Sequence, residues 1–304
     1  MKIKITKEKL NTFFTYETVK MVAVCVALCF AIFLVFNAFT TRPSYGQEIV
    51  ILYERDLVAG KDVDKVLSSL TTKPENDEEK TTFSYEVLRV SKTELNESDY
   101  NIEYMLKRVY TELYEDDIMF LTEDVYKSYI SEGFATDIIV YLEDAISFFK
   151  EKGLCNQEGV FSKSAVDSYF YQTRGKDKRF KTAQQKEQGA NYEYERVTSI
   201  YKYAKALLNV FELHPELLTE TTFDYYGQTF TGKYAIELSS LVGNGENKPE
   251  NLFSRAVMNE TEIEYTAQGV YLVLGENKEQ TGDLYYESVT FLYEIVNRYT
   301  PYLN

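Results

Sequence analysis

The sequence predicts an α/β protein in which an N-terminal transmembrane helix is followed by a two-lobed body. Three observations lead to this prediction. Residues 21–39 form a run of nineteen residues without a charged side chain. From residue 48 onward, short apolar segments of strand type alternate with segments of helical periodicity. Roughly 260 residues follow the apolar run, which is enough for one large or two modest domains, and we expect two lobes.

The apolar run Met21–Phe39 is long enough, at ~1.5 Å per residue, to cross the ~30 Å hydrocarbon layer of a bilayer. Lysines outnumber acidic residues in segment 1–20, which the positive-inside rule places in the cytoplasm. We therefore expect residues 21–40 to contact the lipid bilayer. The chain would be a single-pass protein of the cell membrane with a cytoplasmic N-terminus and an extracytoplasmic body.

A cleaved signal peptide is the alternative interpretation of the same run. Phe39 stands where a cleavage site requires a small residue, and the run is longer than the ~7–15 apolar residues of a typical signal core. These two features favour an uncleaved anchor, followed by a short linker at residues 41–47.

Composition limits the classes of partner. The net charge is −15, and the body that follows the apolar run is strongly acidic. Nucleic acids are excluded as expected partners, because their binding needs a basic surface. Cys155 is the only cysteine after the apolar run, so no disulfide is expected within the body.

Hydrophobic periodicity predicts the first elements of the body. We expect three strands, at residues 48–53, 82–90 and 117–121, to belong to one sheet. One helix is expected at residues 61–70, followed by a charged loop at 71–81. A second helix is expected to follow a cap signal at residues 96–99 and to extend through Tyr114. Farther along, the pattern at residues 181–218 predicts one long amphipathic helix that ends before Pro215.

Two segments resemble a known family. The first is DIMFLTEDVYKSYISEGFATDIIVYLED at residues 117–144, a strand followed by a short helix, a glycine and a second helix. The second comprises Gly269–Leu274, the turn Glu276–Lys278 and the helix Tyr285–Val296. Both segments resemble the bacterial extracellular solute-binding proteins of the periplasmic-binding-protein type II class. The resemblance covers about a fifth of the chain.

The resemblance implies a division of the body into two lobes. Residues 48–135 together with 266–304 would form lobe I, and residues 136–265 would form lobe II. It also implies a ligand held between the lobes, and a membrane transporter or other membrane complex as the partner. The chain departs from the family in having a transmembrane segment where a lipid anchor is usual, and in lacking tryptophan.

The sequence offers little for catalysis. His214 is the only histidine, and no nucleophile-elbow, phosphate-loop or dinucleotide-binding glycine motif is present. Metal centres built on histidine and cysteine therefore lack ligands. We expect no catalytic residues, no cofactor and no metal site.

The candidate ligand-binding residues follow from position in the sheet. Loops after the carboxyl ends of parallel strands face the binding crevice in α/β proteins. Tyr53 and Arg55 follow the first strand, and Thr122 and Glu123 follow the third. Two functions remain open: a solute-binding-like module for a small ligand or partner peptide, or a non-catalytic scaffold or accessory subunit of a membrane complex that has lost ligand binding.

Overall fold

The computed structural model describes residues 7, 18–39, 48–66, 89–95, 118–176, 180–225, 227–259, 262–275 and 286–303. The chain divides into two compact units, Met1–Arg42 and Pro43–Asn304. Several predictions lie outside the described residues: the helix expected after residues 96–99, the loop at 71–81, the turn at 276–278, and most of the strand at 82–90.

The first unit contains the helix α2 (Thr18–Phe39). In the part of the chain that the structure describes, no helix is both long enough and apolar enough to cross a membrane. The transmembrane helix predicted at residues 21–40 is therefore wrong, which is the first correction to the predicted fold class.

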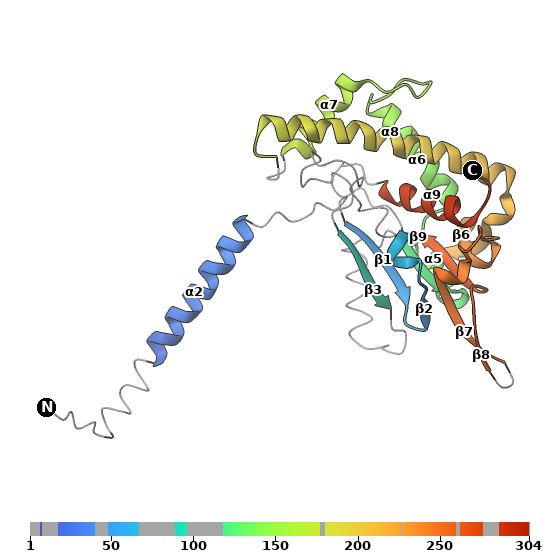
Figure 1. Ribbon diagram of the computed structural model, residues 1–304, viewed down its shortest axis with the longest axis horizontal. Coiled ribbons are helices and arrows are strands. Elements are labelled where there is room, and N and C mark those ends of the chain that lie inside the picture. The colour runs from blue at the N-terminus through green and yellow to red at the C-terminus, as the bar shows by residue number, and fades with distance from the viewer. Residues whose placement is uncertain are drawn as a thin grey trace. The chain divides into compact units, whose positions relative to one another are not determined.

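The second unit is built on a six-stranded mixed sheet with the order β3-β1-β4-β9-β6-β5 (Figure 1). Strands β1, β3 and β4 run parallel to one another, while β9 runs antiparallel to both of its neighbours, β4 and β6. The bounds are β1 Glu48–Glu54, β3 Arg89–Leu95, β4 Ile118–Thr122, β5 Thr219–Tyr225, β6 Gln228–Glu237 and β9 Val270–Leu274. The carboxyl ends of β1, β4 and β6 consequently lie at the same edge of the sheet.

Helices cover both faces of this sheet. The larger core packs one face against α6 (Ile138–Glu151), α8 (Ala183–Leu213) and α9 (Glu287–Tyr299). On the opposite face, a smaller core packs Met119, Leu121 and Val273 against α5 (Glu123–Ser131). Along β4 and β9, residues of the larger core (Ile118, Phe120 and Leu272) alternate with these residues of the smaller core. Both central strands are therefore buried on both faces, which explains why they are apolar throughout.

Side-chain hydrogen bonds fix the residues at which the helices α6 and α8 begin. The carboxylate of Asp137 accepts hydrogen bonds from the backbone N–H of Ile139 (2.8 Å) and Val140 (3.1 Å), which starts α6. Its second oxygen accepts the N–H of Lys233 in β6 (2.7 Å), so the cap also ties α6 to the sheet. Thr182 and Gln185 form a capping box at the start of α8.

A second, three-stranded antiparallel sheet has the order β2-β7-β8. It comprises β2 (Leu57–Ala59), β7 (Phe253–Asn259) and β8 (Glu262–Thr266). Phe253 anchors this sheet to the main core, because its ring lies 4.3 Å from that of Phe120 and 5.5 Å from that of Tyr53. Helix α7 (Lys163–Gln172) packs on α8.

The two-lobed body is the second correction to the predicted fold class. Residues 43–304 form one compact unit, in which β5 and β6, from the segment expected in lobe II, join β4 and β9 of the segment expected in lobe I. The shared backbone hydrogen bonds between β6 and β9 are what unite the two segments. The class that the structure supports is mixed α/β.

Candidate functional site

The best candidate site lies at the sheet edge where β1, β4 and β6 end. We call it the carboxyl-edge cluster and define it by six residues: Glu54, Thr122, Glu123, Glu237, Arg255 and Tyr271. They come from β1, β4, α5, β6, β7 and β9. At this edge the ends of β1 and β4 are joined by a hydrogen bond from the backbone N–H of Thr122 to the Glu54 carboxylate (2.8 Å).

The residues predicted at this edge from β1 occupy two environments. Tyr53 is half-buried and packs on Phe253, which places its ring against the main core. Arg55 is exposed in the turn between β1 and β2. The residue between them, Glu54, is buried and contacts β4 through the Thr122 bond. Of this segment, Glu54 is thus the residue that enters the cluster.

The residues predicted from β4 lie in the cluster. Thr122 is half-buried and precedes the first turn of α5, where the exposed Glu123 forms an ion pair with Lys127 one turn later. That hydrogen bond and the charge of Lys127 lower the pKa of the Glu123 carboxyl, with a smaller contribution from the positive charge of Arg255. Glu123 is therefore ionised at neutral pH and lies within the field of Arg255.

Two stacked tyrosines form the floor of the cluster. The rings of Tyr126 and Tyr271 are nearly parallel, with centroids 4.5 Å apart. Tyr271 pairs in the sheet with Leu121 on one side and Glu237 on the other, and both tyrosines are buried. The Tyr126 hydroxyl forms a hydrogen bond with the hydroxyl of Thr221 in β5. The stack thus joins α5, β5 and β9 beneath the charged residues.

A glycine lets Arg255 approach the start of β9. Gly269 has φ +72°, and a Cβ there would lie 3.1 Å from Arg255 Cζ, so the guanidinium occupies the space that a side chain would fill. Arg255 Nε donates to the carbonyl oxygen of Gln268 (2.7 Å). Glu237 accepts the N–H of Gly269 (2.8 Å). Both charged groups are therefore held by backbone on either side of the same turn.

Within the described residues, the terminal nitrogens of Arg255 have no hydrogen-bond acceptor, and Glu237 uses one of its two oxygens. Both side chains are half-buried. A guanidinium with free, parallel N–H groups is suited to bind a carboxylate in bidentate geometry. The edge thus presents one such cation beside the carboxylates Glu123 and Glu237.

The burial of Tyr271 leads to a prediction about folding stability at alkaline pH. Burial, assisted by the negative charges of Glu237 and Glu123, raises the pKa of Tyr271 to about 12 from an ordinary value of 10.0. Between these values the unfolded chain releases this proton and the folded chain keeps it, so folding stability should fall as pH rises from 10 to about 12. Tyr271→Phe should make that decline shallower in urea unfolding measured across this range. An unchanged slope would contradict the assignment.

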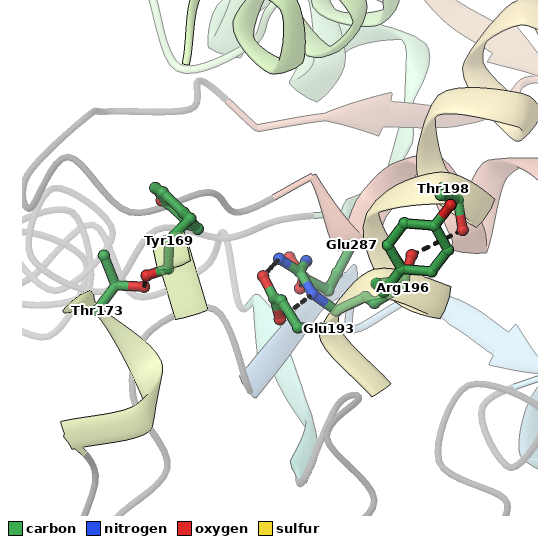
Figure 2. Close-up of polar contacts among 7 residues, drawn as sticks. Tyr169, Thr173, Glu193, Arg196, Thr198 and Glu287 are labelled. Carbon is green, nitrogen blue, oxygen red and sulfur yellow. Dashed lines mark hydrogen bonds and ion pairs between the residues drawn. The ribbon is translucent and has the colours of Figure 1, made fainter. Parts of the chain in front are cut away.

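A second charged cluster is buried between helices (Figure 2). Arg196 of α8 donates from Nε and Nη2 to the carboxylate of Glu193 (3.1 and 2.8 Å), and from Nη1 to Glu287 at the start of α9 (2.6 Å). All three side chains are buried. We interpret this triad as an internal tie between α8 and α9, because its members face one another and are shielded from solvent.

Several members of the carboxyl-edge cluster could not be found from the sequence. Glu237 and Arg255 belong to β6 and β7, strands that were not predicted, and Tyr271 belongs to a predicted strand whose place between β4 and β6 was unknown. Glu54 carried the same positional signal as its neighbours Tyr53 and Arg55. In the described part of the chain, no three histidine, cysteine or acidic side chains are grouped to hold a metal ion.

Comparisons of the chain with protein-family models, with curated proteins and with solved structures give no match. The function therefore has to be argued from the site itself.

Proposed function

We propose that the protein is a solute-binding-type module whose carboxyl-edge cluster binds a small zwitterionic ligand, such as an amino acid or the end of a peptide. The observation that supports this is the placement of Arg255 and Glu237 beside the turn at Gly269, where each is held by a backbone hydrogen bond. A fixed guanidinium with free donors lies beside carboxylates that face the same edge. Such an edge matches a ligand that carries a carboxylate and an ammonium group together.

Each charged group has a defined part in this proposal. Arg255 binds the ligand carboxylate through its terminal nitrogens. Glu237, through its second oxygen, and Glu123 accept hydrogen bonds from the ammonium group. Tyr271 and Tyr126 supply a rigid aromatic base beneath the ligand. The proposal involves no bond-making step, so the module is a binder and not an enzyme.

Thermal unfolding in the presence of candidate ligands tests the proposal. We expect amino acids or short peptides to raise the melting temperature, and sugars to leave it unchanged. A ligand at a hundred times its dissociation constant stabilises the folded state by about 2.7 kcal/mol. At about 2–4 °C per kcal/mol for a domain of this size, the rise should be several degrees and easily measured.

Arg255→Gln should abolish the ligand-induced rise while leaving the unliganded melting temperature nearly unchanged, because the side chain is half-exposed. Lys202→Gln is the matched control: it removes one exposed positive charge from α8 and should keep the rise. The proposal fails if no zwitterion shifts the melting temperature, or if both variants respond to ligand like the wild type. The scaffold function would then be the better explanation.

A further inference from the structure

The three-stranded sheet presents an apolar face to solvent. Strand pairing sets Met258 opposite Ile263 and Ala256 opposite Tyr265, so these four side chains share one face, to which Val58 of β2 also belongs through its pairing with Ser254. We call these five residues the apolar hairpin face. Met258, Ile263 and Tyr265 are 82, 58 and 56% exposed. Contiguous apolar side chains at such exposure are typical of interaction surfaces.

The same sheet has an open edge. Within the described residues β8 pairs only with β7, so the outer backbone N–H and C=O groups of β8 have no strand beside them. β7 and β8 also extend away from the main sheet (Figure 1). An exposed edge strand of this kind is a template on which another extended segment can add.

The opposite face of β8 is acidic. Glu262 and Glu264 alternate with Ile263 and Tyr265, and all four side chains are exposed. An added strand would therefore meet apolar side chains on one face and carboxylates on the other. Because cross-strand pairs of opposite charge stabilise a sheet and like pairs destabilise it, β8 favours a strand with basic residues at every second position.

A second copy of this chain does not meet that requirement. Antiparallel pairing of two β8 strands centred on Glu264 sets this residue opposite itself, and pairing centred on Ile263 sets Glu262 opposite Glu264. These two registers oppose carboxylates, and in any register a second β8, which contains no basic residue, supplies no cation opposite Glu262 and Glu264. We propose that β8 and the apolar hairpin face bind an extended segment of a partner protein in which lysine or arginine alternates with apolar residues.

The apolar hairpin face is separate from the carboxyl-edge cluster, whereas Glu262 and Glu264 lie on the same face of the small sheet as Arg255. Arg255 pairs with Thr266, and therefore points to the face of the sheet opposite the apolar hairpin face. The partner-strand proposal does not depend on a zwitterionic ligand. Ile263→Ser and Arg255→Gln, which change opposite faces of the small sheet, can therefore separate the two proposals.

Binding of a fluorescent peptide, Lys-Val-Lys-Val-Lys-Val, to the full chain tests the proposal through fluorescence anisotropy. We expect saturable binding that the double variant Glu262→Lys/Glu264→Lys weakens by about tenfold or more, because it turns attractive cross-strand pairs into repulsive ones. Both glutamates are exposed, so this variant should keep the wild-type melting temperature. Ile263→Ser, on the apolar face, should also weaken binding.

Two controls separate strand addition from general attraction of a basic peptide to an acidic protein. Glu187→Lys/Glu195→Lys makes the same charge change on the exposed surface of α8 and should leave the affinity within about twofold of the wild type. A peptide of the same sequence with N-methylated backbone amides keeps the charge but loses the strand donors, and should not bind.

Three results would overturn the proposal. The first is equal binding of the peptide and its N-methylated form. The second is equal weakening by the β8 and α8 double variants. The third is a concentration-dependent dimer of the unmodified chain, seen by sedimentation and abolished by Ile263→Ser, which would show that a second copy occupies the surface.

Discussion

Replacing Arg196 with leucine should lower the stability of the fold by about 3–5 kcal/mol, which corresponds to a fall in melting temperature of roughly 10 °C or more. The change removes the only cation of the buried triad and leaves Glu193 and Glu287 facing each other between α8 and α9. Two carboxylates shielded from water carry a large desolvation cost once their common partner is lost. Equilibrium unfolding in urea measures the effect.

A triple variant distinguishes loss of the ion pairs from loss of packing. Glu193→Leu, Arg196→Met and Glu287→Leu together remove all three charges and keep side chains of similar size. Because replacement of a whole buried ion cluster by apolar residues is often neutral or stabilising, this variant should recover most of the loss. If the triple variant is less stable than Arg196→Leu, the charges themselves stabilise the junction and the explanation is wrong.

Phe120→Ala should lower the free energy of unfolding by a similar amount, about 3–5 kcal/mol, because it leaves a cavity where the main sheet, the small sheet and α9 pack together. Phe120 is fully buried in β4, and its ring lies 4.3 Å from Phe253 of the small sheet and 6.3 Å from Phe291 of α9. Truncation leaves a cavity that neither the sheet nor α9 can close without moving. Urea unfolding again provides the measurement.

Phe230→Ala is the control for this prediction. Phe230 lies in β6 beyond its pairing with β9, is 39% exposed, and contacts the ring of Phe223 at 5.7 Å. Its loss should cost about 1 kcal/mol, the size of one exposed aromatic pair. Comparable losses in the two variants would mean that Phe120 does not occupy a special position in the core.

The elements that the sequence predicted correctly are those that carry their own pattern. The strand at residues 48–53 and the strand at 117–121 are β1 and β4, the helix at 181–218 contains α8, and Gly269–Leu274 contains β9. Each is either apolar throughout or has a continuous helical stripe. The pattern of apolar residues within such a segment is enough to indicate a strand or a helix, so periodicity alone identifies these elements.

The strands that were missed depend on their neighbours. β5 and β6 are rich in threonine, tyrosine and charged residues and show no clean alternation, and they are held in the sheet by pairing with each other and with β9. Without β6, its link to β9 could not be foreseen, and the chain was divided into two lobes. Glu237 and Arg255 were missed for the same reason, because a residue of a strand can be placed in the sheet only when the strand is known.

The position of β9 in the sheet has a consequence for synthesis of the chain. β9 lies between β4 and β6, although it is the last strand in sequence among the described residues. Until residues 270–274 have left the ribosome, β4 lacks one of its two neighbours and β6 cannot join the parallel strands. Contacts between segments so far apart in sequence slow folding, and a nascent chain in this state exposes the edges of β4 and β6. Truncation just before Val270 should therefore yield a chain that aggregates during translation.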